Sequence, residues 1–333
     1  MTPLDSRSGA IRQALPAVAV ASPAAGDGPA VEALASLSTD ISQLVRPRIA
    51  IMVLATVVTA MWLTAGRPAH LGQLLWLLLG TALVAASSSI ANQILERDTD
   101  RLMPRTARRP IAAGRMTVFT AAVLTAVLLV AGAATIVLSA GSLARGWPPA
   151  AAAVATWLLY VLVYTPMKRR SPLNTAVGAV AGALPVGIGW LAADGPARFA
   201  GGDASGTLTA AALATVLYLW QFPHFMAIAW LYRGQYARAG LRMLTVDDPS
   251  GLRASGQALA AALAMVPVSL VLAVPSGSIR LFLAAGIAAI VYCGASIRFA
   301  VRRDDASART LLLVSLGVLL ALLTAAVVFG QPR

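Results

Sequence analysis

Nine apolar segments of roughly 20 residues each recur along this 333-residue chain, and they limit its fold more than any other feature. They cover residues 48–65, 71–91, 117–139, 148–165, 173–192, 207–232, 255–274, 279–300 and 309–329. Inside lipid, only helices and closed barrels pair all of their own backbone groups, and segments of this length suit helices. We therefore predict an all-α fold, a polytopic membrane protein with about nine transmembrane helices.

The composition excludes a soluble protein. Hydrophobic residues make up 58% of the chain and charged residues 12%, whereas soluble domains are about 25% charged. The net charge of +13 does not indicate nucleic-acid binding here. The basic residues lie between apolar segments and form no separate basic, aromatic-rich domain. We expect the lipid bilayer as a partner and no nucleic acid. The single cysteine, Cys293, lies in a predicted span and offers neither a disulfide nor a metal cluster.

The distribution of positive charge predicts the orientation in the membrane. Most of the 26 lysines and arginines lie in the N-terminal tail or in loops after even-numbered spans. The exceptions are Arg67, Arg145, Arg198, Arg280 and Arg333. Positively charged loops stay on the cytoplasmic side. We expect a multi-pass protein of the bacterial cytoplasmic (inner) membrane with its N-terminus and basic loops in the cytoplasm, or in the matrix if the protein is mitochondrial.

Three regions are expected along the chain. Residues 1–30 are rich in Ala and Pro and lack periodicity, which predicts a disordered tail rather than a removable targeting segment. Residues 31–46 repeat apolar side chains at helical spacing and predict an amphipathic helix on the membrane surface. Residues 47–333 then form the nine-span domain.

The second span is followed by a column of oxygen-bearing side chains. Asn92, Glu96 and Asp100 are four residues apart, so they share one face if the helix continues through them. Oxygen ligands in this arrangement suit a hard cation such as Mg²⁺, which is often shared with substrate phosphates. We expect a metal site facing the membrane surface. Asp98 becomes the ligand instead of Asp100 if the helix unwinds early.

Six arginines accompany this column and suggest a diphosphate. Guanidinium groups pair with phosphate oxygens through two hydrogen bonds, so the other half of a diphosphate site is expected from Arg97, Arg101, Arg105, Arg108 and Arg109. The alternative is a plain cytoplasmic flank. That alternative accounts for the arginines but not for the acids.

The sixth predicted span contains a second group of polar side chains. Gln221 and His224 lie in an apolar, aromatic helix, where polar groups mark a cavity or site. Its expected walls are Tyr218, Trp220, Phe222 and Phe225. A histidine close to Pro223 also has a simpler explanation, which is that it pairs with backbone carbonyls freed by the proline. The Asn92 column, the Lys168 loop and the loop at 236–248 are expected to converge on one membrane face.

These residues carry a resemblance to a known family. The run NQILERDTDRLMPRTARRP at 92–110 resembles the first signature of UbiA-type intramembrane prenyltransferases. Within that superfamily the chain is most similar to the protoheme IX farnesyltransferases, or haem O synthases. The further matching segments are RPRI at 46–49, VYTPMKRRSPLNTAVGAVAGALPVGIGWLA at 163–192, and WQFPHFMAIA with QYARAG within 220–240.

The resemblance implies a UbiA-type bundle and an activity. The expected reaction is the Mg²⁺-dependent transfer of the farnesyl group of farnesyl diphosphate to a vinyl group of protoheme IX, with addition of water, which gives haem O. The product would supply a haem–copper terminal oxidase, with haem A synthase or oxidase assembly factors as partners. Catalytic roles are expected for Asn92, Glu96, Asp100, Lys168 and His224, and His224 either contacts the haem or acts as an acid or base. Substrate contacts are expected from Arg97, Arg105, Arg109, Tyr160, Tyr164, Trp220, Gln221, Phe222 and Tyr236.

The chain departs from the family pattern in one loop. The resemblance implies an aspartate just before Tyr236, but this chain has Gln235 there. Either a second Mg²⁺ binds more weakly, or Asp247 and Asp248 replace the missing charge as metal ligands. The alternative functions are a related prenyltransferase acting on a quinone precursor or a tetrapyrrole, a membrane transporter, and a structural assembly subunit, which would leave the Asn92 column unexplained.

Overall fold

The computed structural model describes residues 38–66 and 70–331, and its helices belong to the compact unit Thr39–Arg333. The predicted tail at 1–30 and the first part of the predicted surface helix, 31–37, lie outside the described residues. Residues 38–45 are helical. Within the described ranges, nine helices are long and apolar enough to cross a membrane, which confirms the prediction of an all-α, polytopic membrane protein.

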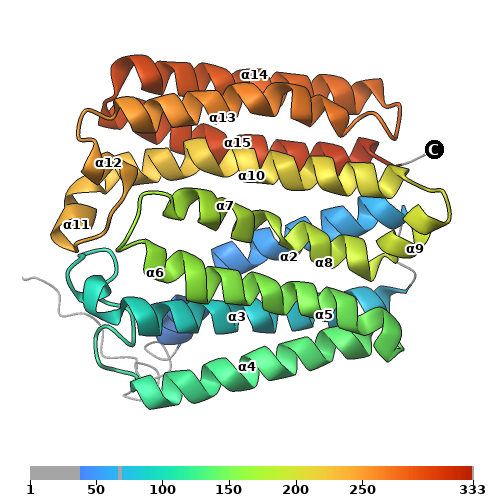
Figure 1. Cartoon of the computed structure of the whole chain (residues 1–333), viewed down its shortest axis with the longest axis horizontal. Coiled ribbons are helices and arrows are strands. Elements are labelled where there is room, and N and C mark those ends of the chain that lie inside the picture. Colours follow the sequence, from blue (N-terminus) through green and yellow to red (C-terminus); the bar gives the residue numbers. More distant parts are fainter. Residues whose placement is uncertain (1–37, 67–69, 332–333) are drawn as a thin grey trace, which may run out of the picture. The chain divides into compact units, whose positions relative to one another are not determined.

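The spans follow the predicted segments closely (Figure 1). They are α2 (Pro47–Ala65), α3 (Leu71–Arg101), α4 (Val118–Ser139), α5 with η1 and α6 (Leu143–Met167), α7 with α8 (Asn174–Ala192), α10 (Ser205–Leu231), α13 (Leu252–Val271), α14 (Ile279–Arg302) and α15 (Asp305–Phe329). Short helices α9 (Gly195–Ala200), α11 (Arg233–Arg238) and α12 (Leu244–Asp247) lie in the connections. The main difference from prediction is α3, which continues past residue 91 to Arg101.

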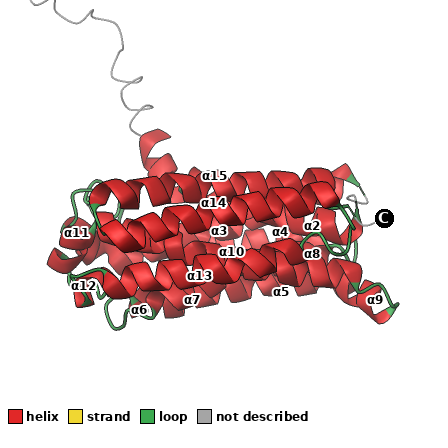
Figure 2. Ribbon diagram, turned by 90° about the horizontal axis from the view of Figure 1, so that it is seen from above, coloured by secondary structure: helices red, strands yellow, loops and turns green. Residues whose placement is uncertain are grey.

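The long helices run alongside one another (Figure 2), and α10 has the most varied partners. α10 packs against α2, α7, α8, α13 and α15, and α2 packs against α3, α8, α10 and α15. α3 and α4 approach closely because a Cβ at Gly80 would lie 2.7 Å from the carbonyl oxygen of Gly132. Small residues permit such backbone contact between helices in lipid.

The fourth span contains a π-helical turn, η1 (Leu159–Tyr164). Pro166 follows it and has no N–H to donate to the preceding turn. The N–H of Thr165 instead bonds the carbonyl oxygen of Tyr160, five residues back, and the Thr165 hydroxyl donates to the same oxygen at 2.8 Å. Such turns occur frequently at functional sites in helices.

Several connections that carry polar residues meet at one end of the bundle (Figure 1). α11, α12, and the loops that follow α3 and α6 all lie there. Residues 38–45 are joined to the same end, because the Gln93 side chain on α3 donates to the carbonyl oxygens of Gln43 and Leu44 at 3.0 and 3.2 Å. Arg46 then turns the chain with φ 51°, and Pro47 begins α2.

Candidate functional site

The predicted column of Asn92, Glu96 and Asp100 occupies successive turns of α3 and is buried. Their exposed fractions are 0%, 8% and 0%. The expectation that this column faces the membrane surface is therefore wrong. The loop after α3 folds back over the helix end, where Thr106 Oγ1 donates to the Asp100 carbonyl oxygen at 3.0 Å and Arg101 Nε donates to the Ala112 carbonyl oxygen at 2.9 Å.

Two cations pair with the carboxylates of this column. Lys168 Nζ lies 2.7 Å from Glu96 Oε1, and Arg109 Nη1 lies 2.6 Å from Asp100 Oδ2 and 3.7 Å from Glu96 Oε2. Burial disfavours the charge on Lys168, but the Glu96 carboxylate together with Tyr164 and Tyr160 outweighs burial, so the pKa of Lys168 is raised. Burial and the nearby charge of Arg46 lower the pKa of Arg109, while Asp100 opposes them. Both carboxylates are thus bound by cations within the protein.

Four buried side-chain oxygens near this end of the bundle have no hydrogen-bond donor among the described residues: Asn92 Oδ1, Asp100 Oδ1, Gln235 Oε1 and Gln93 Oε1. Gln93 lies on the side of α3 that contacts residues 43 and 44, whereas Asn92 and Asp100 belong to the column. The amide of Asn92 is oriented by its Nδ2, which donates to Thr165 Oγ1 at 3.1 Å. Buried oxygens without donors are the ligands that a hard cation takes.

The donor set fits Mg²⁺ as a cation held partly by substrate. The described residues contain no group of three or more His, Cys, Asp and Glu side chains able to enclose a metal ion. Mg²⁺ in phosphate-transfer sites is commonly held by one or two carboxylates, with water and phosphate oxygens completing its shell. Asp100, Glu96 and Asn92 satisfy that requirement.

The π-helical turn presents two tyrosines beside Lys168. The rings of Tyr160 and Tyr164 lie 5.3 Å apart, and Lys168 Nζ lies 4.5 Å from the centre of the Tyr164 ring. Gly178 on α7 makes room for that ring, because a Cβ there would lie 2.6 Å from it. Aromatic faces stabilise a neighbouring positive charge.

The loop after α10 reaches the same place. Arg105 lies 4.6 Å from the centre of the Tyr232 ring and donates to the Tyr236 hydroxyl at 3.3 Å. The backbone N–H of Arg242 donates to the Lys168 carbonyl oxygen at 2.7 Å. The prediction that the three loops converge at one end is therefore confirmed.

Four predicted residues lie away from this cluster or are engaged elsewhere. Arg97 and Asp98 are exposed and lie 3.5 Å apart, and α3 does not unwind before Asp100. Asp247 Oδ2 pairs with Arg242 at 3.0 Å. Asp248 accepts hydrogen bonds from Ser250 and from the N–H of Arg253 near the start of α13, and these bonds lower its pKa.

The sixth span divides its polar and aromatic residues between two faces. Gln221 Nε2 donates to the carbonyl oxygens of Ala179 and Leu217 at 2.9 and 3.0 Å, which joins α10 to α7. Phe222 packs beside it in a buried cluster. Trp220 and His224 face α15, where His224 Nδ1 lies 2.8 Å from Ser315 Oγ.

Sequence reasoning assigned no role to Arg46 or Thr165. Arg46 has a buried Nη2 without a partner among the described residues, and its charge acts on Glu96, Asp100 and Arg109. The only sequence feature that could have indicated a role for Arg46 was its place in the RPRI run at 46–49. Thr165 orients Asn92 from 73 positions away, and nothing in the local pattern indicates that contact.

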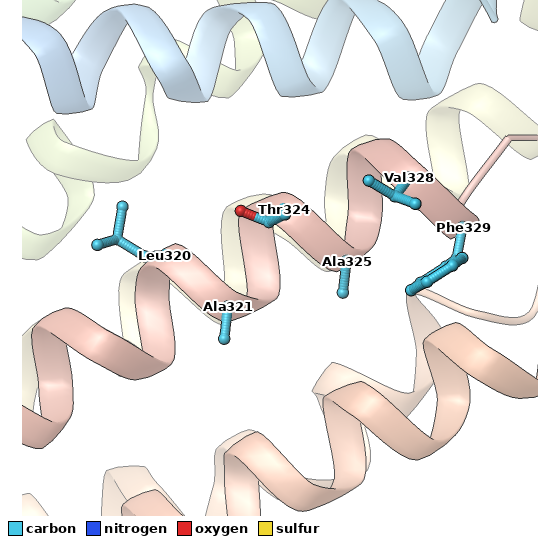
Figure 3. Close-up of a pocket in the computed structure, with 6 residues that line it drawn as sticks. All are labelled: Leu320, Ala321, Thr324, Ala325, Val328 and Phe329. Carbon is cyan, nitrogen blue, oxygen red and sulfur yellow. The ribbon is translucent and has the colours of Figure 1, made fainter.

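A pocket of about 380 Å³ lies on α15 and does not belong to this cluster (Figure 3). Its lining residues are Leu320, Ala321, Thr324, Ala325, Val328 and Phe329. Asp305, which begins α15, pairs with Arg233 at 3.0 Å, so the last turns of α15 lie at the other end of the bundle. The lining is nearly all apolar, as suits a surface facing lipid.

Comparison with known proteins agrees with the fold and the resemblance. Residues 53–323 match the UbiA prenyltransferase family. A protein named protoheme IX farnesyltransferase from Rhodopirellula baltica is 43% identical over 292 residues, which cover 84% of this chain and 96% of that protein. One of the same name from Solibacter usitatus is 36% identical over 286 residues, which cover 83% of this chain and 93% of the relative.

Solved structures share the arrangement of helices. A structure described as digeranylgeranylglyceryl phosphate synthase in membranes has a TM-score of 0.66 at 15% identity and covers 88% of this chain and 98% of its own. A UbiA homolog from Archaeoglobus fulgidus bound to GPP and Mg²⁺ has a TM-score of 0.59 at 17% identity, over 86% of this chain and 99% of its own. At these identities the likeness concerns the fold alone.

Proposed function

The chain belongs to the UbiA prenyltransferase family, and from that premise we propose that it transfers the farnesyl group of farnesyl diphosphate to a vinyl group of protoheme IX. The protoheme IX farnesyltransferases that resemble it along most of their length support this acceptor. Within the structure, the proposal depends on one observation: the buried chain of charges from Lys168 through Glu96 and Arg109 to Asp100.

The cations of this cluster suit the departure of a diphosphate. As the allylic C–O bond breaks, its electron pair leaves with the diphosphate, and fixed positive charges stabilise that developing anion. Lys168 and Arg109 are held in place by carboxylates, and Arg105 is held against two tyrosines. The unpartnered Nη2 of Arg46 offers a further hydrogen-bond donor.

Asn92, Glu96 and Asp100 would hold Mg²⁺, which supplies additional positive charge beside the diphosphate. The two buried oxygens without donors, Asn92 Oδ1 and Asp100 Oδ1, support this assignment. Gln235 Oε1 offers a third, neutral oxygen. In the solved structure from Archaeoglobus fulgidus, a UbiA homolog binds GPP together with Mg²⁺.

The remaining steps take place on the acceptor. The terminal allylic carbon of the farnesyl group bonds to one vinyl carbon of protoheme, and a water adds to the other with loss of a proton. The rings of Tyr160 and Tyr164 offer aromatic faces to the intermediate positive charge and help to exclude stray water. The product, haem O, would serve a haem–copper oxidase, with haem A synthase or oxidase assembly factors as partners.

The location in the cell is part of the proposal. The charge asymmetry of the loops supports a bacterial cytoplasmic membrane with the site end in the cytoplasm. Farnesyl diphosphate, a charged metabolite with a long apolar tail, would then enter from the cytoplasm with its tail among the helices.

Incubating the full chain in native-like membranes with protoheme IX, farnesyl diphosphate and Mg²⁺ tests the function. Mass spectrometry should detect a haem heavier by one farnesyl group and one hydroxyl group. Arg109→Gln should abolish the product, whereas Arg145→Gln, an exposed arginine at the other end of the bundle, should not. Prenylation of a quinone precursor or of chlorophyllide, without any modified protoheme, would refute the proposed acceptor.

A further inference from the structure

His224 on α10 is hydrogen-bonded through only one ring nitrogen within the described part of the chain. Its Nδ1 lies 2.8 Å from Ser315 Oγ on α15. The single hydroxyl hydrogen of Ser315 is donated to the carbonyl oxygen of Leu312 at 2.6 Å. The Ser315 oxygen must therefore accept a hydrogen bond from Nδ1–H. The neutral imidazole then carries its proton on Nδ1 and a lone pair on Nε2.

The ring of His224 is also fixed in orientation. The indole of Trp220 stacks on it at 4.7 Å between centres, and Phe225 contacts it edge to face at 5.6 Å. Trp220 Nε1 donates to the Ser315 carbonyl oxygen at 2.7 Å, and the Tyr292 hydroxyl donates to the Trp220 carbonyl oxygen at 2.7 Å. Ser315 thus holds both the imidazole and the indole that stacks on it.

This arrangement is the one that metal-binding histidines adopt. Such a histidine donates its second ring N–H to a neighbouring acceptor, which sets the tautomer and makes the ligating nitrogen more basic. Haem iron is commonly bound by histidine in this way. The aromatic rings beside His224 are also suited to an apolar macrocycle.

His224 lies at a depth comparable to that of the charged cluster. It is seven residues before the end of α10 at Leu231, or about 10 Å along the helix. Asn92 lies nine residues before the end of α3 at Arg101, or about 13 Å. Both helix ends lie at the end of the bundle where α11 and α12 are found (Figure 1). An acceptor held at His224 would therefore sit at the level of the column on α3.

We infer that Nε2 of His224 binds the iron of protoheme IX, and that Ser315 is the positioning residue that holds the imidazole in the tautomer this requires. The inference rests on the proposed function, because it takes protoheme as the acceptor substrate. It assigns His224 an iron-ligand role rather than that of an acid or base.

Spectroscopy of the full chain in lipid nanodiscs tests the inference without turnover. The probe is protoheme IX alone, without farnesyl diphosphate. The wild-type chain should show the absorption and resonance Raman signature of imidazole-bound iron, and His224→Ala should lose it, with recovery on addition of free imidazole. Ser315→Ala should weaken protoheme binding about 10- to 100-fold and lower the iron–imidazole stretching frequency. Ser315→Thr, which keeps a hydroxyl, should retain both properties.

Ser269→Ala on α13 is the matched control. Ser269 is as fully buried as Ser315 and donates to a carbonyl oxygen three residues back, that of Val266, at 2.9 Å, but no hydrogen bond joins it to His224 in the described part of the chain. Its spectrum should equal that of the wild type. If Ser315→Ala fails to fold, Ser315→Cys, with a weaker acceptor, should give an intermediate stretching frequency.

The outcomes separate the inference from the function on which it rests. An imidazole signature that survives His224→Ala, or a wild-type chain that farnesylates protoheme without any such signature, overturns the inference and leaves the proposed function intact. A wild-type chain that neither binds protoheme saturably nor modifies it overturns both.

Discussion

Lys168 Nζ lies 2.7 Å from Glu96 Oε1, although the two residues are 72 positions apart. The pair joins the fourth span to the second and is almost fully buried. A buried ion pair contributes little over an apolar pair, but removing one partner leaves an uncompensated charge. The same contact therefore supports the fold and, in the proposed function, holds a cation beside the diphosphate.

Lys168→Met should lower kcat/KM for the prenyl diphosphate by about 100-fold. It should also destabilise the chain by about 3–5 kcal/mol, because Glu96 remains buried with only the more distant Arg109. Combining it with Glu96→Gln should restore much of the thermal stability but none of the activity. A double variant that regains activity would show that the pair acts only in folding.

Gln235→Asp should lower the Mg²⁺ concentration needed for half-maximal rate several-fold, because it adds charge at a buried oxygen that now has no donor. Asp247→Asn combined with Asp248→Asn should leave that concentration unchanged, since Asp247 already pairs with Arg242 and Asp248 already accepts from the N–H of Arg253 at the start of α13. An increased Mg²⁺ requirement in the double variant would support the hypothesis that these two acids bind the metal. Chelation of Mg²⁺ should stop the wild-type reaction reversibly.

Gly178→Ala should reduce activity about tenfold or more, because the new methyl group displaces the Tyr164 ring, which lies against Lys168. Gly187→Ala, in the same span, is the control. A Cβ at Gly187 meets nothing within 4 Å, and alanine favours a helix by about 1 kcal/mol over glycine. Steady-state rates and thermal unfolding should therefore separate the two variants, and equal effects would contradict the proposed role of the Tyr164 ring.

The helix at 38–45 should loosen in acid. The bonds from Arg115 lower the pKa of Asp40, outweighing a small opposing effect of burial. The pKa of Asp40 is lower in the folded chain than its ordinary value of about 4. The ion pair with Arg115 therefore stabilises the folded state fully above about pH 4, and this stabilisation is lost as the pH falls through the lowered folded-state pKa. A spin label at Ser42→Cys, in a Cys293→Ala background, should become mobile only in that acidic range.

The variant Asp40→Asn should show the same increased mobility already at pH 7. A label at Ser142→Cys, at the other end of the bundle, should be insensitive to both changes. Equal mobility at Ser42 with and without Asp40 would show that other contacts hold this helix.

Reporter fusions test the orientation. A reporter after Arg170 should be cytoplasmic and one after Arg333 external, because an odd number of spans places the two termini on opposite sides. Finding both reporters on one side would contradict nine spans.

Much of this fold could be predicted from the sequence because lipid imposes length and hydropathy on each span. The Asn92 column could be predicted as well, since a spacing of four residues places side chains on one helical face. Its burial could not, because that depends on the loop after α3 folding back, with hydrogen bonds such as that of Thr106 to Asp100. Nothing in local periodicity indicates where a polar loop will lie.

The partners of single side chains were equally hidden from sequence reasoning. Ser315 lies 91 positions from His224 in a helix that reads as an ordinary apolar span. The π-helical turn depends on Pro166 and on the hydroxyl of Thr165, and local propensity does not distinguish it from a simple kink. Arg46 could not be distinguished, from sequence alone, from the other basic residues that flank membrane spans, so its place beside the charged cluster was not predicted.

The π-helical turn also bears on how such a site can change in evolution. It accommodates one residue more than an α-helical turn would, so losing that residue by deletion would restore a regular helix. Because the wider turn absorbs that residue, the helix before it and the helix after it would keep their faces. Tyr164 and Lys168 would stay on the same side of the span, although the bond from the Thr165 N–H to the Tyr160 carbonyl oxygen would be lost. A one-residue deletion should therefore be tolerated better within residues 159–164 than in the regular helix on either side, where it would rotate all following side chains by about 100°.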